Sequence, residues 1–209
     1  MAVSSLDVFV CDDCNNHVQV FRSDGQFLWT SGSGGSGDGQ FQYPCGIALS
    51  SKGEVFVCDH SNNRVQVFTS AGKFLWKWGS QGSGVGKFSN PFSLTVHKGE
   101  VFMCDISNHC VEVFSIEGKF LQTWGSRGSR AGQFSSPYSI AVTAQDEVLV
   151  SDSGNHHIQA FSKEGQYLGH WGSCGSGDGQ FSNPHGVFVT SVGEVVVCDC
   201  GNYQIQIFQ

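Results

Sequence analysis

Five aspartates recur along the chain and are the first residues whose type and spacing suggest chemistry. They are Asp12, Asp59, Asp105, Asp152 and Asp199, so the successive intervals are 47, 46, 47 and 47 residues. Carboxylate oxygens are ligands that calcium prefers. However, an Asn follows each Asp three residues later, and short Asp and Asn side chains commonly hydrogen-bond the nearby backbone and fix turns. We therefore predict five structural turn residues, with binding of calcium or another ligand as the alternative.

The nine cysteines offer a second possible chemistry, either disulfides or metal binding. Four of them directly precede the repeated Asp, and Ser151 takes this place in the remaining repeat; the four are Cys11, Cys58, Cys104 and Cys198. An odd count without a secretory signal argues against a disulfide framework, and a position that accepts Cys or Ser is typical of a small buried site. Cys11 with Cys14, and Cys198 with Cys200, each resemble half of a zinc site, but no second pair has suitable spacing. We expect no metal and no other cofactor.

The residue after each proline is the third candidate for a functional role. The four prolines, Pro44, Pro91, Pro137 and Pro184, share one register, yet the residues that follow them are Cys45, Phe92, Tyr138 and His185. Four unlike side chains at one position of a repetitive sequence indicate specialisation for partner binding, and drift at a tolerant position is the alternative. We add five residues from neighbouring segments as candidate partner-binding residues, although unligated surface histidines are the simpler interpretation; the five are His17, His157, Arg64, Arg127 and Arg130.

These residues need a scaffold that presents the same positions five times. The copy at residues 41–87 contains four short apolar segments, 46–49, 54–58, 64–68 and 73–79, separated by turns rich in Gly, Ser and Asn. Short strands of this composition at intervals near ten residues are typical of all-β proteins. Four antiparallel strands per repeat, together with the period, predict a β-propeller of four-stranded blades.

The period divides the chain into three full repeats and two incomplete ones: approximately 1–40 (partial), 41–87, 88–133, 134–180 and 181–209 (partial). No linker or break in composition separates them, so residues 1–209 are expected to form a single domain. In such a blade the second strand ends on the side where the third begins. The Asp turns and the glycine-rich loops before each proline should therefore share one face, named here the loop face.

Residues 55–96 resemble the NHL repeat, whose pattern is Asp-x-x-Asn-x-Arg-Ile-Gln-Val-Phe, then Gly-x-Phe, Trp-Gly, Gly-Gln-Phe and Pro-x-Gly. The resemblance recurs in register along the whole chain and is greatest to the C-terminal propellers of the tripartite-motif ubiquitin ligases. It implies a fragment of a six-bladed ring, with a complete five-bladed ring as the alternative. The Arg of the repeat is kept only as Arg64 and is replaced at the other four positions, by His17, Cys110, His157 and Gln204.

The resemblance also implies a function: a non-catalytic protein-interaction platform that recognises the substrate or partner of a ubiquitin ligase. Ligase activity would require a RING domain outside this chain. Some relatives bind single-stranded RNA, which is the alternative partner, although a formal net charge of −7 gives little attraction for RNA. A zinc-dependent peptide-amidating lyase is a second alternative, but only His185 matches its histidines after the prolines. A purely structural module that assembles through open blade edges is a third.

The remaining expectations concern location and excluded ligands. No apolar run is long enough to cross a bilayer, and the first ten residues lack the basic region and apolar stretch of a secretory signal. We therefore expect a cytoplasmic protein with no membrane contact, no small-molecule substrate and no catalytic residues in this chain.

Overall fold

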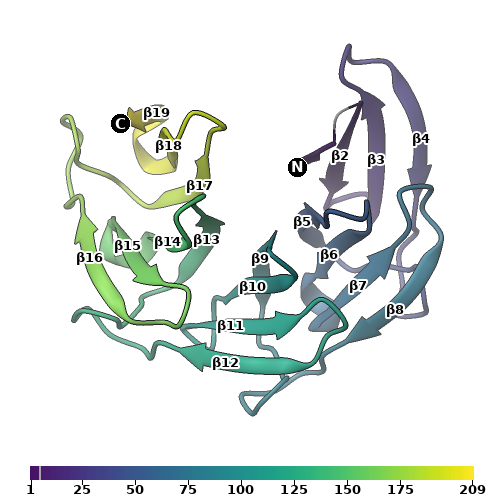
Figure 1. The fold of residues 1–209 in the computed structure, drawn as a ribbon, viewed down its shortest axis with the longest axis horizontal. Helices are drawn as coiled ribbons and strands as arrows, with labels where there is room; N and C mark the ends of the chain where they lie inside the picture. The colour runs from purple at the N-terminus through teal and green to yellow at the C-terminus, as the bar shows by residue number, and fades with distance from the viewer. Residues whose placement is uncertain (5) are drawn as a thin grey trace. The chain divides into compact units, whose positions relative to one another are not determined.

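The computed structural model describes residues 1–4 and 6–209, and these residues form an all-β fold. Five small sheets of described residues follow one another along the chain, and in each of them strands that are consecutive in sequence are neighbours (Figure 1). Four sheets have four strands, and the last has three. The predicted β-propeller architecture of small antiparallel blades is confirmed.

The first two sheets occupy residues 2–78. The first contains β1 (Ala2–Val3), β2 (Asp7–Asp12), β3 (His17–Arg22) and β4 (Phe27–Ser31). The second contains β5 (Pro44–Leu49), β6 (Val55–Asp59), β7 (Arg64–Phe68) and β8 (Phe74–Trp78).

The other three sheets occupy residues 91–208. The third contains β9 (Pro91–His97), β10 (Glu100–Asp105), β11 (Cys110–Ser115) and β12 (Phe120–Trp124). The fourth contains β13 (Pro137–Val142), β14 (Glu147–Asp152), β15 (His157–Ser162) and β16 (Tyr167–Trp171). The fifth contains β17 (Pro184–Val189), β18 (Val195–Asp199) and β19 (Gln204–Phe208).

The second strand of every sheet ends at the repeated Asp. After three of these strands the chain makes one turn of 3-10 helix, and these turns are η1 (His60–Asn62), η2 (Ser153–Asn155) and η3 (Cys200–Asn202). Each turn closes on a residue with left-handed backbone: Asn63, His156 or Tyr203. The repeated Asp-x-x-Asn segment is therefore a compact connection between the second and third strands.

The described residues group into two compact units. One comprises Met1–Val101 with Ser115–Phe120, and the other comprises Phe102–Phe114 with Leu121–Gln209. The first unit has a core of buried aromatic and branched side chains from its first two sheets and the loop between them, including Phe9, Phe41 and Phe68. Burial of such side chains stabilises a fold by about 1.5–3 kcal/mol each.

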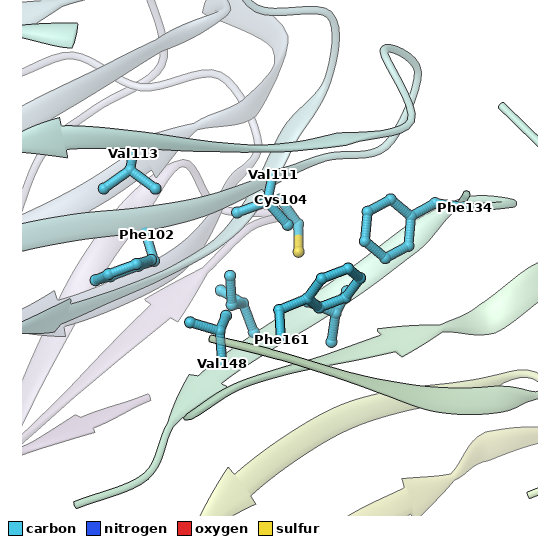
Figure 2. Packing of buried hydrophobic residues seen from close by; sticks show 9 residues of the cluster. Phe102, Cys104, Val111, Val113, Phe134, Val148 and Phe161 are labelled. Atoms are coloured by element: carbon cyan, nitrogen blue, oxygen red, sulfur yellow. The ribbon is translucent and has the colours of Figure 1, made fainter. Parts of the chain in front are cut away.

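The second unit contains two such cores. In one, Phe102, Cys104, Val111 and Val113 from β10 and β11 pack against side chains of the following sheet, among them Phe161 (Figure 2). Its Cys104 sulfur lies in this apolar cluster, and burial raises the pKa of the thiol well above its usual value. The other core joins β14 and β15 to β17 and β18 through Leu149, Ile158, Val187 and Val197.

Burial differs between the inner and outer strands of one sheet. All residues of β6 and β7 are buried, whereas β8 alternates between half-buried and exposed residues. A strand with both faces covered reads as a continuous apolar run, and a strand with one solvated face shows a period of two. The two middle strands of this sheet are thus fixed by packing, and variation is tolerated at its outer strand.

The four in-register cysteines do not share one environment. Cys58 and Cys104 are buried, whereas Cys11 and Cys198 are half-buried, and all nine cysteines are free thiols. Within residues 1–4 and 6–209, no three His, Cys, Asp or Glu side chains are grouped so as to hold a metal ion. Over the same residues, the structure contains no helix that is both long enough and apolar enough to span a membrane.

Candidate functional site

The turn after β6 is held by Asp59, whose side chain is fully buried. Its Oδ1 accepts a 2.7 Å hydrogen bond from the backbone N–H of Gln42, and its Oδ2 accepts one of 3.0 Å from Nε2 of Gln66. The Asn62 carboxamide donates to the same carboxylate and to the carbonyl oxygen of Gly35, both at 2.9 Å. Asp59 therefore ties the turn to the glycine-rich loop that leads into the same sheet.

Arg64 completes this arrangement. Its Nε donates a 2.6 Å hydrogen bond to Oδ2 of Asp59. Its Nη1 donates to the carbonyl oxygen of Ser36 at 2.7 Å, and its Nη2 donates to those of Gly37 at 2.8 Å and Gln40 at 2.9 Å. Only 7% of Arg64 is exposed. The sequence made Arg64 a candidate partner-binding residue, but its guanidinium already donates four hydrogen bonds inside the protein.

The turns at Asp12 and Asp199 use the same chemistry. Hydrogen bonds from Asn15 and Gln19 lower the pKa of Asp12. Burial raises the pKa of Asp199, but hydrogen bonds from the Ser182 backbone and from three side-chain amides outweigh it, so the net shift is downward. The repeated Asp is thus a charged acceptor occupied by the protein itself.

The residue five positions after the repeated Asp is Arg64 in the second sheet and differs in the other repeats. The contacts of the Asp differ accordingly. Nε2 of His17 lies 3.3 Å from Oδ2 of Asp12, and Nε2 of His157 lies 3.2 Å from Oδ2 of Asp152. Both histidines were candidates for partner binding, and both contact the turn Asp of their own sheet. Imidazole is shorter than the Arg side chain, and a cavity of about 210 Å³ lies beside His157.

A second repeated contact involves the left-handed residue at the end of each turn. In four of the five turns, its side chain accepts a hydrogen bond from the backbone N–H of the residue that precedes the next proline. Asn16 and Asn63 use Oδ1 for Tyr43 and Asn90, at 2.9 and 3.2 Å, and His109 and His156 use Nδ1 for Ser136 and Asn183, at 3.3 and 3.1 Å. These contacts position the residues after the prolines, because they fix the start of each inner strand.

In the first unit, two residues that follow prolines meet at an open depression. Cys45 Sγ donates to the carbonyl oxygen of Phe92 at 2.9 Å, and desolvation raises the pKa of this thiol well above its usual value. The Phe92 ring contacts His60 edge-on, with centroids 5.8 Å apart. Together with Asp13, Tyr43 and Ser61 they line a volume of about 330 Å³. Tyr43 is 53% exposed at its mouth.

In the second unit, the other two such residues stack on each other. The rings of Tyr138 and His185 lie 4.0 Å apart between centroids, with an angle of 11° between their planes. Burial lowers the pKa of His185. The two side chains therefore form a face-to-face aromatic stack at the start of β13 and β17.

Arg127 and Arg130 lie in the glycine-rich loop before Pro137 and are exposed. The loop is closed by a parallel bridge between Arg127 and Phe134, and the backbone N–H of Arg130 donates to Oε1 of Gln133 at 3.2 Å. Both cations project from an ordered loop and not from a disordered tail. Burial and the Arg127 charge lower the pKa of the adjacent His109.

Two residues in unusual environments were missed by sequence reasoning. Glu112 is 5% exposed, and one of its carboxylate oxygens, Oε2, has no hydrogen-bond partner within the described part of the chain. Its register is held by Gln66, Gln159 and Gln206 in other repeats, so the departure was visible in the sequence. His170 lies on an outer strand, 4.8 Å from His157 between ring centroids, and no periodic signal marks it.

The fold resembles several solved structures. A streptogramin B lyase matches 99% of this chain and 66% of its own, at 16% identity and a TM-score of 0.71. The virginiamycin B lyase from Staphylococcus aureus matches 99% of this chain and 68% of its own, at 13% identity and a TM-score of 0.68. A protein of unknown function from Bacteroides thetaiotaomicron matches 99% and 57%, at 13% identity and a TM-score of 0.76. At such identities the similarity concerns the fold.

These similarities correct one expectation. The sequence was taken to exclude an enzyme, because the resemblance was to binding propellers. That inference is wrong, since two of the proteins that share this fold are lyases. A propeller of this kind is compatible with catalysis, and its glycine-rich and Asp-containing loops carry no argument against it.

The sequence comparisons address the repeat itself. No curated protein matches the chain. The NHL repeat family matches residues 41–68, 134–161 and 181–208. Each matched segment begins at the buried Phe of a glycine-rich loop and ends at the Phe that closes the third strand. Three segments of the chain therefore match the NHL repeat, and each of them contributes strands to one blade of the β-propeller.

Proposed function

We propose that the loop face is a recognition surface for a protein partner. The observation that carries this proposal is the depression bounded by Tyr43, Cys45, His60 and Phe92. It combines a half-exposed Tyr, a second aromatic ring and polar groups on an ordered scaffold. Aromatic side chains in such settings contribute most of the binding energy at protein interfaces, and binding residues commonly occupy loops on rigid scaffolds.

The charge distribution supports a protein partner over RNA. The depression contains Asp13 and no Lys or Arg, and the formal net charge of the chain is −7. Binding of nucleic acid derives much of its affinity from Lys and Arg contacts with phosphates. The finer proposal is recruitment of the substrate of a ubiquitin ligase, which rests on the sequence resemblance to tripartite-motif propellers.

The repeats themselves supply the test variant. Asn90 and Asn183 occupy the register of Tyr43 with the same left-handed backbone, so Tyr43→Asn removes the aromatic ring without straining the turn. Val192, which is 79% exposed in the turn between β17 and β18, gives a control as Val192→Ala. A photo-crosslinking residue placed at Ser61, in the wall of the depression, would label bound proteins in a cell extract.

The expected result is a defined set of crosslinked proteins that Tyr43→Asn reduces at least tenfold and Val192→Ala leaves unchanged. One purified member should then bind the isolated wild-type chain and not Tyr43→Asn. Loss of all crosslinks on RNase treatment would favour RNA. Equal labelling of the three proteins would refute recognition at this depression.

A further inference from the structure

We infer that the cavity beside His157 is a binding site for a guanidinium group supplied from outside the chain. It lies in the second unit, between the glycine-rich loop 125–134 and the turn that follows β14. Its lining consists of loop residues 129–131 together with Asn155, His157, Gln159 and His170. The volume, about 210 Å³, is many times the roughly 10–15 Å³ that is needed to hold one water.

The second sheet shows what such a site holds when the chain itself provides the group. There the guanidinium of Arg64 lies between the carboxylate of Asp59 and three carbonyl oxygens of the preceding loop, those of Ser36, Gly37 and Gln40. A planar guanidinium directs five N–H donors in fixed directions and suits several acceptors at once. The loop backbone of this sheet is therefore arranged as a cradle for guanidinium.

The fourth sheet keeps the cradle and lacks its occupant. Ser129, Arg130 and Gln133 stand in the registers of Ser36, Gly37 and Gln40. Equivalent hydrogen bonds hold both loops: Gln66 Nε2 donates to the Gln40 carbonyl, Gln159 Nε2 donates to the Gln133 carbonyl, and each bond is 2.6 Å long. His157, in the Arg64 register, bonds Asp152 instead.

The walls of the cavity also suit this ligand. The rings of His157 and His170 lie at an angle of 38° to each other, and Nδ1 of His170 contacts the Tyr167 hydroxyl at 2.5 Å. Guanidinium stacks on flat aromatic surfaces. The Asp152 carboxylate supplies negative charge behind His157. Arg130 is the one Lys or Arg among the lining residues of this cavity; it is exposed, and the high dielectric of water weakens the effect of an exposed charge.

The guanidinium belongs either to an arginine side chain of a partner or to a free small molecule. Both present the same group to the site. If it belongs to a protein partner, the inference deepens the function proposed above; the binding of free guanidinium compounds does not depend on that function. The probe is N-acetyl-arginine amide, compared with N-acetyl-citrulline amide, which has nearly the same shape without the charge. Binding is measured by titration of backbone amide NMR signals.

We expect the arginine probe to shift the amides of residues 128–133 and of His157, and to bind at least tenfold more tightly than the citrulline probe. His157→Arg places a guanidinium in the cradle and should abolish binding. His17→Arg makes the same change in the first sheet and should leave it intact. Ala131→Trp blocks the exposed side of the cavity and should also abolish binding. It provides the test if His157→Arg does not fold.

Three results would overturn the inference: equal affinity for arginine and citrulline, unchanged binding in His157→Arg or Ala131→Trp, or stronger shifts of the same amides with inorganic phosphate. Tyr43→Asn tests the protein-recognition surface and should not change binding of the arginine probe. A failure of one proposal is therefore distinguishable from a failure of the other. An arginine-containing peptide that binds tenfold more tightly than the free probe would identify a polypeptide as the source.

Discussion

The backbone N–H of Ser136 donates a 3.3 Å hydrogen bond to Nδ1 of His109. An imidazole accepts at this nitrogen only when it is neutral. Burial, with a further contribution from the Arg127 charge, lowers the pKa of His109, so the folded protein favours the accepting form. At the same register Asn16 and Asn63 accept through an amide oxygen that does not titrate near neutral pH.

His109→Asn should therefore remove an acid sensitivity. In wild type the folded-state pKa lies below the unfolded value, so the unfolded state binds more protons and stability falls as pH drops below about 6.5. In His109→Asn this contribution disappears, while the hydrogen bond, worth about 1 kcal/mol, is retained. Urea unfolding at pH 5 and pH 8 measures the stability and its pH dependence. His109→Ala serves as the comparison and should lose stability at both values, and an unchanged pH slope in His109→Asn would count against this account.

Glu112 should produce the opposite pH dependence. Burial, followed by the nearby Asp105 charge, raises the pKa of Glu112 from 4.5 to about 8. Its folded-state pKa exceeds the unfolded value, so the unfolded state releases its proton first and stability falls as pH rises from about 4.5 to 8. Glu112→Gln restores the amide found in the other repeats and should raise the free energy of unfolding by about 2 kcal/mol at pH 9.

The effect of Glu112→Gln should shrink towards zero below pH 4.5, where the carboxyl group is protonated in both states. Glu147→Gln, at an exposed position of β14, provides the control and should alter neither the stability nor its slope. A gain that is equal at pH 4 and pH 9 would mean that packing, and not charge, sets the cost of Glu112.

The sequence predicted the sheets because one physical signal repeats in it. A short apolar run before an Asp, with turn residues after it, defines the end of β2, β6, β10, β14 and β18 in turn. The repeat period does not show which residues far apart in the sequence contact each other. Arg64 was a candidate for partner binding because of its place on the loop face, but the carbonyl oxygens that accept its hydrogen bonds belong to residues 36–40, more than twenty positions earlier.

The candidate site was less predictable than the fold for the same reason. The unlike residues after the prolines were visible in the sequence, but the contact of Phe92 with His60 and the stacking of Tyr138 on His185 join residues of different segments. The cavity beside His157 lies where the fourth sheet has a shorter side chain than the Arg64 of the second sheet. Predicting this cavity from the sequence would require knowing which atoms the longer Arg side chain contacts in the folded protein.

Gly125 should be intolerant of any side chain. Its φ is +102°, and a Cβ built there would lie 2.6 Å from the Phe134 ring and 3.0 Å from the carbonyl oxygen of His109. Gly132, in the same loop, also has positive φ (+74°) but faces open space. Gly132→Ala should cost about 1 kcal/mol of stability from backbone strain alone. Gly125→Ala should cost about 3 kcal/mol, because overpacking against a buried ring is added to the strain. Thermal and urea unfolding compare the two, and similar losses would show that Phe134 moves aside freely.

Removal of the Arg64 guanidinium should destabilise the turn and the loop together. Arg64→Ala leaves the buried Asp59 carboxylate without its cationic donor and deprives three loop carbonyls of theirs, so we expect a loss of about 3 kcal/mol. Arg64→His should lose less, about 1–2 kcal/mol, because His157 shows that imidazole reaches the Asp in this register.

Arg22→Ala is the matched control, since Arg22 forms an exposed pair with Asp24 at 3.8 Å and such pairs contribute about 0–1 kcal/mol. Hydrogen exchange of the amides at residues 35–41 should accelerate in Arg64→Ala and remain slow in Arg22→Ala. If Arg64→Ala costs no more than Arg22→Ala, the guanidinium does not hold the glycine-rich loop, and the cradle inferred beside His157 loses its precedent.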